Sequence, residues 1–263
     1  LKLLVGASEI VDVLDQNLTS KVSVYIEIDP QYGRSGVKFS NHKIIQSILN
    51  RIRESTNINF EGFYAHAGHS YKCRGENEIK DLVRPILKNL SELKTNFGGK
   101  LCWGDTPSCS ILEDFEEVDQ ISPGNFVFYD WMQTTIGSCT PGEIAVKMEC
   151  PVVAKYEDRK ELLIHGGAVH FSKDFILKIN GDRNFGQIIN PDAEDDLSNY
   201  LKSISQEHGI VSCSESFFKN IQVGDIVSIY PIHSCLTANL MQAYILDNGG
   251  VLEHFSSGAP FRG

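Results

Sequence analysis

The chain has 263 residues, 41% of them hydrophobic, which is enough to bury a sizeable core in one large domain or two smaller ones. A formal net charge of −10 and the lack of a Lys/Arg cluster argue against a nucleic-acid partner, because phosphate binding needs a basic surface. No apolar run approaches the roughly 18 residues that span a bilayer, and no signal peptide is recognisable. The seven cysteines form no CxxC pair. We therefore expect a soluble cytoplasmic protein with reduced thiols and no membrane partner.

The first half of the chain alternates apolar strands with amphipathic helices. Strands are expected at 22–29, 60–67, 100–104 and 125–129, and helices at 42–54 and 76–96. This order is typical of a (β/α)8 barrel, although, with the apolar run at 3–6 included, only about five of its eight strands can be counted. Because the chain starts at Leu1 and runs directly into an apolar segment, we expect about three upstream units to be absent. The alternative is a complete open sheet with Leu1 at a true edge.

From about residue 140 the pattern changes to short strands rich in Val and Ile and separated by turns. They are expected at 144–156, 161–171 and 222–230. The predicted fold class is therefore α/β, with a partial (β/α)8 TIM-type barrel at 1–140 followed by an all-β, barrel-like domain at 141–263. The stretch 180–205 is polar and is expected to be a surface excursion. It is acidic at Asp192, Glu194, Asp195 and Asp196, a run that favours a solvated loop over a cation site.

Four polar segments follow strands of the first half, at the positions where barrels carry their active sites. They lie at 29–36, 64–71, 104–108 and 122–125. Each combines glycine, whose backbone N–H can approach a ligand closely, with hydroxyls or amides that bind phosphate oxygens. Any one of them is also typical of an ordinary turn. Together they favour a ligand that carries a phosphate.

A histidine and a cysteine two residues apart, His233 and Cys235, follow the β-branched run 225–230. On an extended segment their side chains would project from the same face. An imidazole nitrogen and a thiolate suit zinc, and two protein ligands would leave positions open for water or a substrate oxygen. The spacing alone is more typical of a buried cysteine beside a hydrogen-bonded histidine, so both interpretations stay open.

Four motifs occur in an order that resembles one family of enzymes. They are YAHAGHSY at 64–71, GDTPS at 104–108, SQEHG at 205–209 and PIHSCLT at 231–237. In this order they resemble the D-serine dehydratase and D-threonine aldolase family of pyridoxal-phosphate enzymes. The resemblance covers nearly the whole chain and implies the alanine racemase architecture, a (β/α)8 barrel followed by a β domain.

The resemblance also implies roles for individual residues. Thr106, Gly124 and Asn125 match positions that hold the cofactor phosphate, Tyr71 and His66 match cofactor contacts, and His233 and Cys235 match the zinc ligands of the dehydratase branch. The aldolase branch has an aspartate in place of the cysteine, so Cys235 favours the dehydratase. Family members commonly carry asparagine at the position of Ile232, which leaves the substrate choice open. No lysine of the chain matches the Schiff-base lysine, which we expect upstream of residue 1.

The activity implied by the resemblance is elimination of water from a β-hydroxy D-amino acid to give a 2-oxo acid and ammonia, with zinc as a Lewis acid. Two alternatives remain within this family, namely retro-aldol cleavage of the D-threonine aldolase type and binding of pyridoxal phosphate without turnover. A purely structural zinc protein is a third alternative. A homodimer is expected by resemblance.

Overall fold

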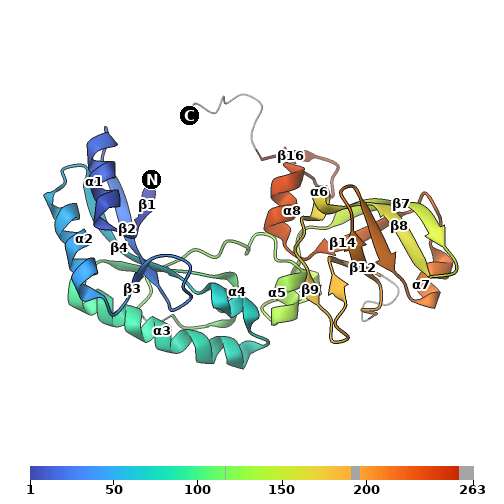
Figure 1. Cartoon of the computed structure of the whole chain (residues 1–263), viewed down its shortest axis with the longest axis horizontal. Coiled ribbons are helices and arrows are strands. Elements are labelled where there is room, and N and C mark those ends of the chain that lie inside the picture. The colour runs from blue at the N-terminus through green and yellow to red at the C-terminus, as the bar shows by residue number, and fades with distance from the viewer. Residues whose placement is uncertain (116, 191–195, 255–263) are drawn as a thin grey trace. The chain divides into compact units, whose positions relative to one another are not determined.

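A computed structural model describes residues 1–115, 117–190 and 196–254 of the chain (Figure 1). The chain divides into two compact units. The first comprises Leu1–Phe126 and Ile136–Ser138, and the second comprises Val127–Thr135 and Cys139–Gly263. The first unit is α/β and the second contains a closed antiparallel barrel, so the expected fold class is confirmed. None of the helices within the described ranges combines the length and apolar character that a bilayer span requires.

The first unit is built on a parallel sheet with the strand order β1-β2-β4-β5-β6, in which β3 also pairs with β2. Its strands are β1 (Lys2–Val5), β2 (Val22–Asp29), β3 (Val37–Lys38), β4 (Ile58–His66), β5 (Lys100–Gly104) and β6 (Gln120–Ile121). Its helices are α1 (Ser8–Asn17), α2 (His42–Glu54), η1 (Gly68–Lys72), α3 (Glu76–Phe97) and α4 (Thr106–Ile111). Helices α1, α2 and α3 run beside the sheet and contact its strands (Figure 1). Because neighbouring strands are parallel, their carboxyl ends lie along one edge.

The strongly periodic elements of this unit form as the sequence predicts. Helix α2 begins where the Asn41 side chain accepts the N–H of Ile44, and its apolar face is buried. Both β2 and α2 have the predicted bounds, while β4 and α3 differ from theirs by one or two residues. The strand predicted at 125–129 is wrong, because this segment forms turns. The Asn125 N–H donates to the Thr106 hydroxyl instead of to a neighbouring strand.

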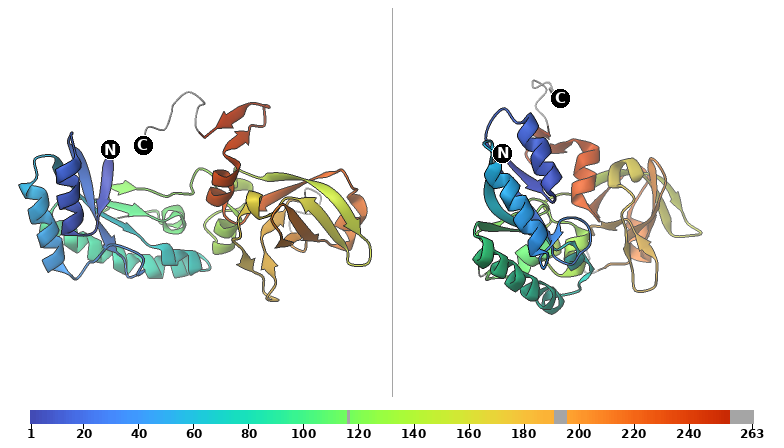
Figure 2. Two further views of the ribbon diagram at one scale, coloured as in Figure 1. Left: turned by 45° about the horizontal axis from the view of Figure 1, so that its top comes forward. Right: turned by 60° about the vertical axis from the view of Figure 1, so that its left-hand side comes forward.

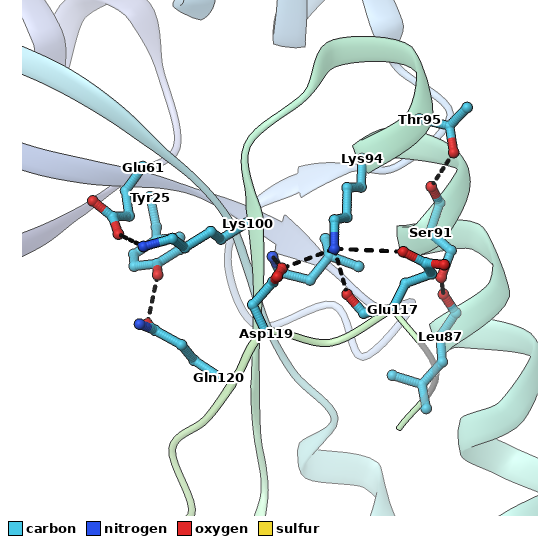
Figure 3. A network of polar contacts seen from close by, with 11 residues as sticks. Tyr25, Glu61, Leu87, Ser91, Lys94, Thr95, Lys100, Glu117, Asp119 and Gln120 are labelled. Carbon is cyan, nitrogen blue, oxygen red and sulfur yellow. Dashed lines mark hydrogen bonds and ion pairs between the residues drawn. The ribbon is translucent and has the colours of Figure 1, made fainter. Parts of the chain in front are cut away.

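A polar network crosses the sheet near the amino-terminal ends of β1 and β5 (Figure 3). The Glu61 carboxylate lies 2.8 Å from Lys100 Nζ and 3.3 Å from Lys2 Nζ. Beside it, the Tyr25 hydroxyl donates to Gln120 Oε1 at 2.6 Å. Barrels carry their active sites at the carboxyl ends of the strands. Lys2 and Lys100 therefore lie at the opposite end of the sheet from the expected site.

The second unit contains a closed six-stranded barrel with the order β11-β12-β13-β8-β7-β14, and every pair of neighbours is antiparallel. The barrel strands are β7 (Met148–Tyr156), β8 (Glu161–His165), β11 (Gly186–Ile188), β12 (Tyr200–Ile204), β13 (His208–Ser212) and β14 (Ile226–Pro231). Around them lie α5 (Trp131–Ile136), η2 (Pro141–Glu143), α6 (Ala168–Phe171), β9 (Ile176–Leu177), β10 (Arg183–Asn184), α7 (Glu215–Asn220) and α8 (Ser234–Met241). The barrel is filled by alternate apolar side chains, including Val152, Leu162, Ile164, Leu201 and Val211. A last hairpin, β15 (Ala243–Ile245) and β16 (Val251–Glu253), projects from this unit (Figure 2).

The stretch 180–205 is not the surface excursion that its polarity predicts, because it supplies β11 and β12 to the barrel. Three of its polar residues, Asn184, Gln187 and Asn199, are buried and joined by hydrogen bonds. Asn184 Nδ2 donates to Gln187 Oε1 at 3.1 Å, and Gln187 Nε2 donates to the Asn199 carbonyl at 2.8 Å. These residues are polar, as in a loop, but they are buried in the barrel, where their hydrogen bonds are made within the protein.

Of the four acidic residues at 192–196, only Asp196 is among the described residues. Asp192, Glu194 and Asp195 lie outside them. The Asp196 carboxylate accepts the Ser198 N–H at 3.0 Å and the Asn199 side-chain amide at 2.8 Å. Asp196 thus stabilises the turn that leads into β12.

Glu161, in the barrel, provides a test of pH-dependent stability. Burial raises the pKa of its carboxyl, but hydrogen bonds from Lys202 and Arg159 outweigh it and bring the pKa below the ordinary value. A group of this kind contributes its full stability above its unfolded pKa of about 4.3 and loses it as the pH falls through the folded pKa. We expect Glu161→Gln to lower the free energy of unfolding at neutral pH by about 1 to 2 kcal/mol.

The measurement is urea denaturation of the parent and of Glu161→Gln across the acid range. The difference between them should be largest above about pH 5 and should shrink at lower pH, where the native carboxylate becomes protonated. A difference that stays constant down to about pH 2 would contradict this account of Glu161.

Candidate active site

The residues predicted to bind the cofactor lie in the first unit, and the two predicted to bind a metal lie in the second. In the first unit, β4 ends at His66 and β5 ends at Gly104, and these two residues are paired across the sheet. The segments that follow them therefore start side by side. Burial, with a smaller contribution from the nearby Arg34 guanidinium, lowers the pKa of His66, so this imidazole favours the neutral state. Tyr71 lies in η1, five residues further along the chain.

A buried carboxylate, Asp105, holds the two motifs of this edge together. Asp105 precedes α4 and accepts the Ser108 N–H at 2.8 Å and the Ser108 hydroxyl at 2.6 Å. It also accepts the Ser70 hydroxyl at 2.8 Å, which joins η1 to α4. Burial raises the pKa of Asp105, and these hydrogen bonds oppose the rise. Asp105 was not predicted as a site residue, although an aspartate followed by Thr-Pro-Ser is a recognisable helix-start pattern.

Two of the predicted phosphate-binding residues are in direct contact. The Asn125 N–H donates to the Thr106 hydroxyl at 3.0 Å, and both residues are buried. Gly124, the third, has no atom within 4 Å of the position that a Cβ would take. The three residues thus form one small polar surface with open space beside it.

The segment 29–36 packs against the segment that follows β4. The Tyr32 ring stacks on the His69 ring, with a centroid separation of 5.6 Å, and lies so close to Gly68 that a Cβ there would be 2.4 Å from it. A hollow beside this contact is lined by Glu27, Ile28, Asp29, Pro30, Tyr32, Arg34, Ser35 and His66. Sequence reasoning identified the segment but did not assign Tyr32 or Arg34 to the site.

In the second unit, His233 and Cys235 lie at a junction between a strand and a helix. Strand β14 ends at Pro231, His233 has extended backbone angles (φ −132°, ψ 94°), and α8 begins at Ser234. The predicted extended geometry is therefore wrong beyond His233, because Cys235 lies in the first turn of a helix. The junction still brings the two side chains together, and the imidazole is hydrogen bonded to the Cys235 side chain.

The second ring nitrogen of His233 faces a carboxylate that the sequence did not identify. Nδ1 lies 2.8 Å from Asp174 Oδ2, across 59 residues of sequence. The hydrogen bond to the Cys235 side chain, opposed by burial and reinforced by Asp174 and Asp130, raises the pKa of His233 to about 9. The thiol and the carboxylates around this imidazole thus favour its protonated, positively charged form.

A second carboxylate, Asp130, is buried and fixes the backbone between the two predicted metal ligands. Its Oδ1 accepts the Gln133 N–H at 2.9 Å, in the first turn of α5. Its Oδ2 accepts the Ser234 N–H at 3.0 Å, at the start of α8. One carboxylate therefore caps two helices and holds Ser234 in place.

Replacing Asp130 by Asn is expected to lower the free energy of unfolding by about 2 kcal/mol. An amide can accept one of the two backbone N–H groups, but its own NH2 group would then face the other donor. Urea denaturation measures the loss. Asp158→Asn is the matched control, because Asp158 is exposed on a turn, and it should change the free energy by less than about 0.5 kcal/mol. Equal losses in the two variants would contradict this role of Asp130.

Ile232, where family members commonly carry asparagine, packs away from the polar residues of the junction. Its side chain is buried with Trp131, Ile144 and Ile176, and its carbonyl accepts the Met132 N–H at 3.3 Å. Ile232 therefore joins β14 to α5 by apolar packing. Over the described part of the chain, no group of three or more His, Cys, Asp and Glu side chains is arranged to hold a metal ion. The predicted metal ligands at 233 and 235 are therefore a pair and not part of a larger cluster within the described residues.

Comparison with known proteins agrees with the resemblance drawn from the motifs. Residues 145–246 match the family described as the putative serine dehydratase domain. The chain is 30% identical over 249 residues to D-serine dehydratase from Dictyostelium discoideum, which covers 87% of this chain and 61% of that protein. The chain spans about three fifths of the length of the curated relatives that it matches.

Solved structures share the fold. D-threo-3-hydroxyaspartate dehydratase from Delftia sp. HT23 has a TM-score of 0.80 at 21% identity, and the match covers 96% of this chain and 71% of that protein. An alanine racemase-like protein from Idiomarina loihiensis has a TM-score of 0.75 at 25% identity and covers 95% and 69%. Over the span that it shares with these relatives, the chain is similar to D-serine dehydratases, and residues 145–246 match the serine dehydratase domain.

Proposed function

We propose that the full-length protein is a lyase that depends on pyridoxal phosphate and zinc and eliminates water from a β-hydroxy D-amino acid, with D-serine as the first candidate. The products are a 2-oxo acid and ammonia. The observation that carries the proposal is the His233–Cys235 pair at the start of α8, within the matched serine dehydratase domain. The related D-serine dehydratases and hydroxyaspartate dehydratase act by name on amino acids of this class.

The residues of the junction fit a zinc ion by the chemistry of their donors. A thiol and an imidazole are brought into hydrogen-bonding contact, and Asp174 engages Nδ1, which leaves Nε2 as the nitrogen available to a metal. One turn along α8, the buried Thr237 hydroxyl has no hydrogen-bond partner among the described residues. When bound, zinc supplies a Lewis acid for a departing hydroxyl group.

The residues at the carboxyl edge of the sheet fit a phosphate. Thr106 and Asn125 present a hydroxyl and an amide side by side, and the space beside Gly124 is open. When bound, pyridoxal phosphate supplies an electron sink for the reacting carbon. Asp105 accepts hydrogen bonds from both η1 and α4 and so fixes the two segments relative to each other. These segments carry Tyr71 and Thr106, which are predicted to contact the cofactor. His66, whose pKa is lowered by burial, presents a neutral imidazole at the same edge.

The test is turnover of D-serine by the full-length protein with pyridoxal phosphate, comparing zinc-loaded protein with protein treated with a chelator. Pyruvate that forms only with the metal is the expected result. Glycine released from D-threonine without pyruvate would instead place the protein with the aldolases. Cofactor uptake without any product would replace this proposal by a binding function.

A further inference from the structure

Asp174 contacts His233 on the ring nitrogen that faces away from the proposed metal. The distance from Asp174 Oδ2 to His233 Nδ1 is 2.8 Å, and both side chains are partly exposed. Among the described residues, His233 is the only basic side chain that pairs with this carboxylate. A histidine that binds a metal through one nitrogen commonly donates its other N–H to a carboxylate, which fixes the tautomer and the orientation of the ring.

The backbone around Asp174 is held in an uncommon conformation. Ser172, at the end of α6, has φ +69°, in the left-handed region that residues other than glycine rarely adopt. Its N–H donates to the Ala168 carbonyl, and its hydroxyl accepts the Asp174 N–H at 3.2 Å. Such conformations persist where the surrounding structure determines them. The turn after α6 therefore directs Asp174 toward α8, against which α6 packs.

The SQEHG segment at 205–209 anchors the other end of α6. The Ala168 N–H donates to the Ser205 carbonyl at 2.8 Å, and the Val169 N–H donates to the Gln206 carbonyl at 3.1 Å. Gly167 lies so close to this turn that a Cβ would be 2.6 Å from the Gln206 carbonyl oxygen. These contacts connect the turn between β12 and β13, through α6, to the position of Asp174.

We propose that Asp174 is a positioning residue that orients the His233 imidazole so that Nε2 points at the metal. The inference rests on the proposed function, because it assumes that His233 binds a metal. In this proposal the SQEHG segment and α6 hold the Asp174 carboxylate beside Nδ1 of the proposed ligand His233. Asp174 itself does not touch the metal or the substrate.

The experiment measures zinc affinity of the full-length protein and of its Asp174→Ala and Asp174→Asn variants by competition with a chromophoric chelator. Asp174→Ala should bind zinc about 10- to 100-fold more weakly than the parent. Asp174→Asn should lie between them, because an amide oxygen still accepts the N–H. Asp182→Asn is the control, since Asp182 is another carboxylate of this unit that accepts side-chain hydrogen bonds, and it should bind zinc like the parent.

The absorption spectrum of cobalt-loaded protein provides a second measurement. If Asp174 only stabilised the fold, its replacement would not change this spectrum. The absorption band of the cobalt–thiolate bond should persist in Asp174→Ala and shift in energy, while the thermal midpoint stays close to that of Asp182→Asn. Affinity of Asp174→Ala within about twofold of the parent would overturn the inference and leave the proposed function intact. If Asp174→Ala does not fold, the same criterion applies to Asp174→Asn. A parent that binds neither metal overturns both proposals.

Discussion

Replacing Cys235 by Ala is expected to lower kcat/KM for D-serine elimination by about a thousandfold or more in the full-length protein. The thiol is one of the two proposed metal ligands at the junction of β14 and α8, and loss of Lewis-acid assistance is worth several kcal/mol of barrier. Steady-state pyruvate formation, with the zinc content of each preparation measured alongside, tests this. A variant that keeps the zinc content and rate of the parent would exclude Cys235 as a ligand.

Two further variants make this test specific. Cys213→Ala removes a different cysteine of the same unit, which packs against the barrel core, and should keep the zinc content of the parent. Cys235→Asp replaces the thiolate by a harder oxygen donor. It should retain a metal but prefer manganese or magnesium over zinc. Unchanged preference for zinc in Cys235→Asp would mean that this side chain does not contribute to metal selectivity.

Gly62→Ala is expected to have the largest effect on stability, a loss of about 3 to 5 kcal/mol in the free energy of unfolding. Gly62 lies in β4 opposite Lys100 of β5, and a Cβ there would be 1.9 Å from the Lys100 carbonyl oxygen and 2.5 Å from its nitrogen. Backbone atoms of a paired strand cannot move aside as a flexible side chain can. The methyl group would therefore separate the two strands that end at His66 and Gly104.

Urea denaturation of the full-length protein provides the measurement. Gly142→Ala is the control, because a Cβ at Gly142 meets no atom within 4 Å and its backbone does not require glycine. It should change the free energy of unfolding by less than about 0.5 kcal/mol. Gly62→Ala with the stability of the parent would mean that β4 and β5 pair less closely than described.

The sequence predicts best those elements whose periodicity extends over several turns or residues. Helix α2 buries Ile45, Ile48 and Leu49 on one face, and this spacing is visible in the sequence alone. The barrel strand β11 was missed because Gln187 is polar and buried, and its partner Asn184 is recognisable only once the chain is folded. Composition therefore distinguishes a loop from a strand only where polar residues are exposed and apolar residues are buried.

The site illustrates a second limit. Motifs identify His233 and Cys235 because they are close in sequence, but they do not identify the side chains that hold them. Asp174 is 59 residues from His233, and Asp130 is 104 residues from Ser234. Both carboxylates come from turns with no distinctive spacing. Contacts made across the fold, rather than along the chain, support the chemistry that the motifs predict.

The closure of the barrel restricts how another chain could bind the second unit. Each of its six strands has two hydrogen-bonded neighbours, so none presents a free row of backbone groups to which a foreign strand could add. The two-stranded sheets β9–β10 and β15–β16 differ, because within the described residues their strands pair only with each other. A peptide or a second copy that binds this unit by extending a sheet would therefore have to use one of these two small sheets, and any ligand of the barrel itself would have to be recognised by side chains.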